Sequence, residues 1–220
     1  MKTALPFLLC LLALLPASRS ARAEEKAAAA AKPLLVIKAG HLIDAASGTV
    51  RDNQAVVVEG ERIKSVGPAA DATKNLPPDA RVIDLGGATL LPGLIDCHTH
   101  LTFNPGNYYE NTFRRSAADQ AVVAPIYARR TLEAGFTTVR DVGASEYIDF
   151  ALRRAINAGQ IPGPRMLCAG PALSATGGHG DNNGFSPTLK FEALAPWVVD
   201  GPEAIRLRIR TNVKYGADWI

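Results

Sequence analysis

Hydrophobic and polar positions divide the chain into stretches of different pattern. An apolar run lies near the N-terminus, over residues 5–15. Residues 34–91 hold short β-like runs separated by glycine and proline, at 34–37, 55–58, 62–66 and 81–85. From Pro92 onward, strand-like runs alternate with segments of helical period, which is typical of β/α units around a parallel sheet. The pattern therefore predicts a small antiparallel β-unit over residues 34–91, followed by an α/β domain over residues 92–220.

The same patterns predict the individual elements of the α/β domain. Strands are expected at residues 93–100, 136–141 and 165–169, and a fourth is expected to begin at Ala217. Helices are expected at residues 117–134, 146–158 and 202–213, with Gly135 and Gly159 as C-terminal stops. Pro125 is expected to kink the first of these helices. The strand at 93–100 is apolar on both faces, as a buried parallel strand should be.

Residues 1–23 are expected to be a secretory signal peptide. Lys2 supplies a positive charge, the apolar run follows, and Ala21-Arg22-Ala23 fits a small-x-small cleavage site. A membrane span is less favoured, because the apolar run is shorter than the roughly 18 residues that a spanning helix requires. We therefore expect an exported protein, periplasmic or secreted, with no stable membrane span in the mature chain. Residues 24–33, rich in alanine and charge, are expected to be a linker.

Charge and cysteine content indicate which partners and which disulfide bonds are to be expected. The chain has 24 basic and 21 acidic residues, and Lys2, Arg19 and Arg22 are the only charged residues of the leader. The mature part is therefore formally neutral. It has no basic tract with interleaved aromatic residues, so we expect no nucleic-acid partner. Cys97 and Cys168 each lie in a predicted strand and are expected to be buried free thiols.

His98 and His100 carry the strongest chemical signal. Side chains at i and i+2 leave a strand on the same face, so both imidazoles are expected to point together from the C-terminal end of the strand at 93–100. Neutral imidazole is a good ligand for Zn²⁺ and similar ions. A pair of strand-end histidines that only hydrogen-bond to loops is the alternative. The Pro-Gly turn before the strand and the polar loop after it favour the metal site.

Three other residues are weaker candidates. Asp96 lies on the same side as the histidines by strand period and is expected to support them rather than bind the ion. Asp141 follows the second strand and is expected to accept a hydrogen bond that orients an imidazole, although a helix cap or a pair with Arg140 is the commoner role. His179 lies in a glycine-dense loop and is a candidate substrate contact, with a solvated loop as the alternative.

At these residues the chain resembles the amidohydrolase superfamily. The segment PGLIDCHTH, residues 92–100, matches the strand that opens the barrel of that family. Three further segments resemble the branch that contains exported dipeptidases, carboxypeptidases and imidazolonepropionases. They are GFTTVRDVG at 135–143, TGGHGD at 176–181 and YGADWI at 215–220, which resemble the second strand, the loop after the third strand and the start of the fourth.

The resemblance implies a TIM-type (β/α)8 barrel, preceded by a β-sandwich unit that strands from the far C-terminus complete. Such a barrel usually needs about 250 residues, so the chain is expected to hold only its first three to four strands. By the resemblance, two divalent ions, expected to be zinc, are bridged by a carbamylated lysine that falls immediately after Ile220. The general-base aspartate is also expected beyond residue 220. His98 and His100 are expected to bind the more buried ion.

The function implied is hydrolysis of an amide bond in a dipeptide or an N-acyl amino acid by a metal-activated hydroxide. A cyclic-amide hydrolase similar to imidazolonepropionase is one alternative. An inactive fragment or metal-binding module, and an independent binding module at 34–91, are others. The sequence leaves open the metal identity, because His-x-His suits zinc, manganese, iron and cobalt. It also leaves open the substrate side chain and the oligomeric state. A homo-oligomer is compatible with the sequence.

Overall fold

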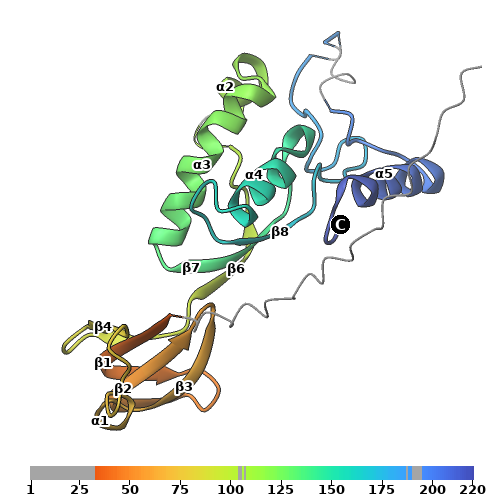
Figure 1. The fold of residues 1–220 in the computed structure, drawn as a ribbon. Helices are drawn as coiled ribbons and strands as arrows, with labels where there is room; N and C mark the ends of the chain where they lie inside the picture. The colour runs from red at the N-terminus through yellow and green to blue at the C-terminus, as the bar shows by residue number, and fades with distance from the viewer. Residues whose placement is uncertain (1–32, 104–105, 107, 187, 190–194) are drawn as a thin grey trace, which may run out of the picture. The chain divides into compact units, whose positions relative to one another are not determined.

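The computed structural model describes residues 33–103, 106, 108–186, 188–189 and 195–220. The expected signal peptide and all but the last residue of the expected linker lie outside this part. The described chain forms two compact units, drawn in Figure 1. One comprises residues 33–43 with 49–90, and the other comprises residues 44–48 with 91–220. No helix in the described part of the chain is long and apolar enough to span a membrane.

The first unit is built on one mixed sheet. Its elements are β1 (Leu34–Asp44), β2 (Thr49–Glu59), β3 (Arg62–Pro68), α1 (Ala69–Ala72), β4 (Arg81–Asp84) and β5 (Thr89–Leu90). The strand order is β3-β2-β1-β4, with β5 also paired to β1. Strands β2 and β3 are antiparallel, as expected, but β1 pairs in parallel with both β4 and β5. The expectation of an antiparallel unit is wrong for these pairs, because the connection through α1 returns the chain in the direction of β1.

The second unit contains β/α units. Its elements are β6 (Leu94–Thr99), α2 (Tyr108–Arg114), α3 (Ala117–Glu133), β7 (Phe136–Asp141), the 3₁₀ helix η1 (Ser145–Tyr147), α4 (Ile148–Asn157), β8 (Arg165–Cys168) and α5 (Pro202–Tyr215). Strands β6, β7 and β8 are parallel neighbours in that order. The three predicted strands and three predicted helices are confirmed to within a few residues. Helix α2 and the short α1 and β5 were not predicted.

Local sequence explains where the helices begin and end. Ser116 and Asp119 form a capping box at the start of α3, in which each side chain accepts the other residue's backbone N–H. Gly135 and Gly159 follow α3 and α4 with φ of 95° and 68°, which confirms them as stops. Helix α3 is unbroken across Pro125. Helix α4 begins later than predicted, because Glu146 and Tyr147 adopt positive φ.

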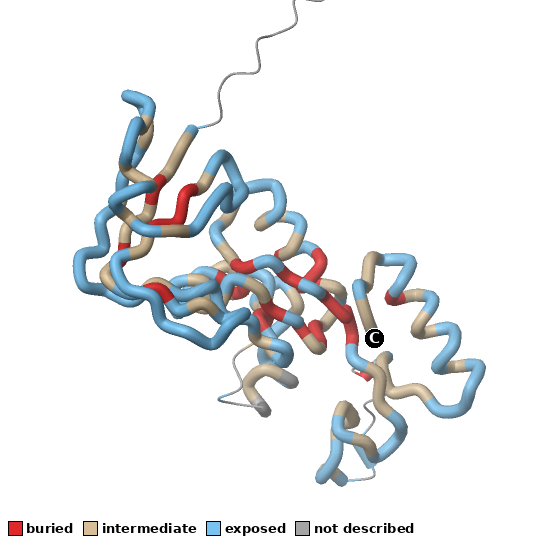
Figure 2. Tube along the Cα trace, turned by 90° about the horizontal axis from the view of Figure 1, so that it is seen from below, coloured by how far each residue is buried: buried red, intermediate tan, exposed pale blue. Residues whose placement is uncertain are grey.

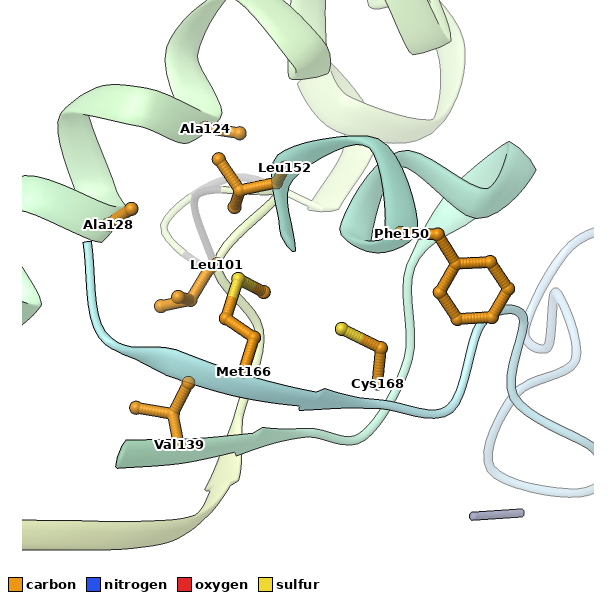
Figure 3. Close-up of a cluster of buried hydrophobic side chains, with 8 residues drawn as sticks. All are labelled: Leu101, Ala124, Ala128, Val139, Phe150, Leu152, Met166 and Cys168. Atoms are coloured by element: carbon orange, nitrogen blue, oxygen red, sulfur yellow. The ribbon is translucent and has the colours of Figure 1, made fainter. Parts of the chain in front are cut away.

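A hydrophobic core joins β7 and β8 to α3 and α4. Figure 3 shows Val139 of β7 and Met166 of β8 on the helix side of the sheet, facing α3 and α4. The core residues are Leu101, Ala124, Ala128, Val139, Phe150, Leu152, Met166 and Cys168. Each large side chain buried here contributes roughly 1.5–3 kcal/mol. By contrast, α5 buries only Asn212, and the helix beside the C-terminus in Figure 2 is mostly exposed or half-buried.

Strand β6 lies at an edge of its sheet, so the expectations of a buried strand and of a buried Cys97 are wrong. Within the described residues it pairs only with β7, so Leu94 and Ile95 are 43% and 66% exposed instead of buried. Cys97 is exposed for the same reason, whereas Cys168 is buried as expected, and both are free thiols. At the other edge no strand forms at Ala217. The Asp218 N–H nevertheless donates to the Cys168 carbonyl at 2.9 Å, so the chain continues alongside β8.

Asp149 places a buried carboxyl group beside this core. Its Oδ2 accepts the Gly170 N–H at 2.9 Å, while its buried Oδ1 has no partner within the described structure. Burial, together with the nearby Asp141 carboxyl, raises the pKa of Asp149 from 3.8 to about 6. Burial likewise raises the pKa of the Cys168 thiol, whose Sγ donates to the Asp149 carbonyl. The ionised form of Asp149 therefore destabilises the fold.

We expect Asp149→Asn to reduce the pH dependence of stability. The folded state binds the Asp149 proton more tightly than the unfolded state, so the free energy of unfolding falls as pH rises from about 4 to 6. The asparagine carbonyl keeps the bond to Gly170 and cannot ionise. Urea titrations across this pH range should show a smaller fall, with a gain at pH 7 of up to about 3 kcal/mol. A variant curve parallel to the wild-type curve would contradict this account.

We also expect Gly170→Ala to destabilise the second unit. Gly170 has φ of 73°, and an added Cβ would lie 2.9 Å from Phe150 Cζ. Gly177 is a matched control, because it has the same φ of 73° with no atom within 4 Å of an added Cβ. Gly177→Ala should cost only the backbone strain, roughly 1 kcal/mol. Gly170→Ala should lower the free energy of unfolding by more, and equal losses in denaturant titrations would show that the contact with Phe150 is unimportant.

Candidate metal-binding site

The candidate site lies where the parallel strands end. Because β6, β7 and β8 run in the same direction, their C-terminal ends meet at one edge of the sheet. His98 and His100 come from the end of β6, and Asp141 is the last residue of β7. Open α/β sheets bind ligands at this edge, because the loops that follow the strands converge there.

A β-bulge sets the position of His98. Asp96 pairs with Val139 and Thr99 pairs with Asp141, so β6 uses three residues where β7 uses two. The His98 N–H donates to the Asp96 carboxylate Oδ1 at 2.9 Å. Asp96 thus satisfies a backbone group beside the bulge and supports His98 through the main chain instead of through the imidazole.

The two imidazoles lie close together, and one of them has a defined tautomer. The ring centroids of His98 and His100 are 5.7 Å apart with an interplanar angle of 77°. His100 Nδ1 lies 2.9 Å from the Gly143 carbonyl oxygen. A carbonyl only accepts, so Nδ1 carries a proton, and in the neutral imidazole Nε2 then presents its lone pair. Metal-bound histidines commonly donate their other nitrogen to a carbonyl in this way, so the geometry of His100 fits a metal ligand.

Asp141 is a fully buried carboxylate between the loops that follow β6 and β7. Its Oδ2 accepts the Leu101 N–H at 2.9 Å and its Oδ1 accepts the Gly143 N–H at 3.2 Å. Burial raises the pKa of Asp141 to about 6, against the opposing effect of these two hydrogen bonds. The sequence predicts a carboxylate that orients an imidazole directly. In the structure, Asp141 instead accepts hydrogen bonds from two backbone N–H groups. One belongs to Leu101, directly after His100, and the other belongs to Gly143, whose carbonyl accepts from His100.

His179 is exposed, in a loop that is held together by several hydrogen bonds. The Trp197 indole donates to the Gly180 carbonyl at 2.6 Å, and the Gly180 N–H donates to Ser174 Oγ at 3.1 Å. The Asp200 carboxylate accepts the Thr176 N–H at 3.0 Å. No group of three or more His, Cys, Asp or Glu side chains that could hold a metal ion occurs among the described residues. Within the described residues, the site therefore consists of His98 and His100 together with the groups that hold them by hydrogen bonds.

Arg140 and Gly143 belong to the surroundings of the site but were not predicted to do so. Arg140 Nε donates to the Cys97 carbonyl at 2.9 Å, and its guanidinium lies 4.3 Å from the centroid of the Trp219 ring. Arg140 thus links β6 to the segment that follows α5. A side chain added at Gly143 would lie 3.5 Å from His100 Cε1. The spacing of residues in the sequence gives no signal for either contact.

Solved structures with a related fold include two peptidases. A Xaa-Pro dipeptidase with methionine bound in its active site matches with a TM-score of 0.72 and 33% identity, covering 84% of this chain and 45% of that one. A prolidase in complex with N-methylphosphonate-L-proline matches with a TM-score of 0.68 and 34% identity, covering the same shares of the two chains.

Curated relatives and a family profile agree with the structural likeness. An ochratoxinase from Aspergillus niger is 30% identical over 201 residues, which are 84% of this chain and 41% of the relative. An imidazolonepropionase from Pseudomonas aeruginosa (strain LESB58) is 42% identical over 78 residues, which are 34% of this chain and 18% of the relative. The chain thus spans less than half the length of these relatives. A profile of the amidohydrolase family matches residues 89–220. The chain therefore belongs to the amidohydrolase family, and its three β/α units are part of that family's barrel.

Proposed function

We propose that this protein is a metal-dependent hydrolase that cleaves the amide bond of dipeptides or N-acyl amino acids. The observation that carries the proposal is the pair of neighbouring imidazoles at the end of β6, with His100 Nε2 left as an acceptor. Membership of the amidohydrolase family supports the reaction class. The likeness to a Xaa-Pro dipeptidase and a prolidase supports a peptide-like substrate.

The residues of this chain take distinct roles under the proposal. His98 and His100 would hold one ion, which when bound supplies a water with its pKa lowered to around 7. Asp96 and the Gly143 carbonyl hold the two ligands in place. The other ligands, including the carbamylated lysine and a general-base aspartate, are proposed to follow Ile220 in the complete protein. Zinc is the ion we propose, with two ions per site.

His179 and the N-terminal segment extend the proposal to substrate binding and cellular location. His179 is proposed to contact substrate, and the hydrogen bonds that hold its loop support a fixed position for its backbone. The apolar run and the small-x-small site at the N-terminus support export. Extracytoplasmic peptide scavenging would suit a dipeptidase.

Hydrolysis of a cyclic amide is the second candidate function. The specific observation in its favour is the 42% identity to an imidazolonepropionase over 78 residues. A substrate panel separates the two candidates, since cleavage of an imidazolone ring with no release of amino acids from dipeptides would favour the cyclic substrate.

We expect His98→Ala and His100→Ala in the full chain to remove bound metal and hydrolytic activity together. Activity should fall by more than about 100-fold, because loss even of the residues that support ligands costs 10–100-fold. Elemental analysis and release of amino acids from a dipeptide panel measure the two effects. His41→Ala is a matched control, because His41 lies in the first unit and pairs with Asp52 at 2.8 Å. Normal metal content and full activity in either site variant would refute the assignment.

A further inference from the structure

We propose that Asp141 is a positioning residue that fixes the orientation and tautomer of His100 through two backbone amides. The proposal rests on the proposed function, in which His100 is a metal ligand. Asp141 does not touch the imidazole in this role. It accepts hydrogen bonds from the backbone that follows His100 and from Gly143, whose carbonyl accepts a hydrogen bond from the imidazole.

The hydrogen bonds form a closed ring of interactions around His100. The Leu101 N–H, on the residue directly after His100, donates to Asp141 Oδ2 at 2.9 Å. The Gly143 N–H donates to Asp141 Oδ1 at 3.2 Å. The Gly143 carbonyl then accepts from His100 Nδ1 at 2.9 Å. One carboxylate therefore fixes both the backbone that carries the ring and the acceptor that receives its proton.

Burial makes this arrangement stiff. Asp141 is 0% exposed and Leu101 is 5% exposed, so water does not compete for the two hydrogen bonds that Asp141 accepts from Leu101 and Gly143. Gly143 also lies directly against the ring, since an added Cβ would be 3.5 Å from His100 Cε1 and 3.3 Å from the Ala172 side chain. A small shift of Gly143 would therefore move its carbonyl away from Nδ1. Without that acceptor, the Nε2–H tautomer becomes accessible, and this tautomer cannot bind an ion through Nε2.

Asp149 offers a matched control for the test. It is also 0% exposed, its pKa is also raised to about 6, and it also accepts a backbone N–H, from Gly170. Its hydrogen bonds do not include Leu101 or Gly143. Replacement by asparagine keeps the shape of both side chains. At position 141, however, an amide NH₂ would face one of the two N–H donors.

The experiment compares Asp141→Asn and Asp149→Asn with the wild type in the full chain. The first measurement is the tautomer of His100 in the metal-free protein, from the ¹⁵N shifts of the ring. The second is Zn²⁺ affinity, from competition with a chelator. We expect the Nδ1–H tautomer in the wild type and in Asp149→Asn, and a mixture in Asp141→Asn. We expect the Zn²⁺ dissociation constant to rise about 10-fold in Asp141→Asn and less than about 2-fold in Asp149→Asn.

Several results would overturn the positioning role. They are an unchanged tautomer in Asp141→Asn, equal loss of Zn²⁺ affinity in both variants, or an Nε2–H tautomer in the wild type. If Asp141→Asn does not fold, Gly143→Ala replaces it, because an added Cβ would lie 3.3 Å from the Ala172 side chain and should shift the Gly143 carbonyl and weaken Zn²⁺ binding. Failure of the wild type to bind Zn²⁺ would refute the proposed function, and the tautomers would then decide the role of Asp141 alone.

Discussion

The parallel pairing of β6, β7 and β8 is the constraint on which the rest of the second unit depends. Parallel strands need long crossovers, and the segments containing α3 and α4 supply them while covering one side of the sheet. The same pairing brings the C-terminal ends of the strands to one edge. His98, His100 and Asp141 come together there although more than 40 residues separate His98 from Asp141.

The buried carboxylates near this edge lower the stability of the fold, although one of them holds the site in place. Burying Asp141 and Asp149 removes two carboxylates from water, and the raised pKa values of about 6 reflect that cost. The core of α3, α4, β7 and β8 offsets it. In return, Asp141 joins the loops after β6 and β7 more rigidly than exposed side chains could. Buried polar groups with full hydrogen bonding specify one arrangement, and Asp141 reaches this condition with both oxygens.

The sequence predicts the elements well, because their periodicity and their stops are local properties. The strand at 136–141 and the helix at 117–134 match β7 and α3 almost residue for residue. Orientation and exposure depend on partners far away in the sequence, so the parallel pairing of β1 with β4 and the exposed edge of β6 were not predicted. The αL conformation of Glu146 and Tyr147 has no sequence signal, since neither is a residue type that favours positive φ.

The sequence predicts only part of the site, because some of its features are local and others depend on distant residues. Strand period places His98 and His100 on one face, and their rings lie 5.7 Å apart. Period gives no information on hydrogen-bond partners, so the backbone roles of Asp96 and Asp141 emerge only from the structure. Asp149 could not be distinguished in the sequence from an ordinary acidic residue in the first turn of a helix.

We propose that the histidine pair at the end of β6 belongs to a hydrolytic metal centre. Elemental analysis of the full-length wild-type protein, with a parallel assay on dipeptides, would decide this proposal. We expect about two zinc ions per chain, together with release of amino acids. A folded, metal-free and inactive protein would contradict it and would leave His98 and His100 as structural residues.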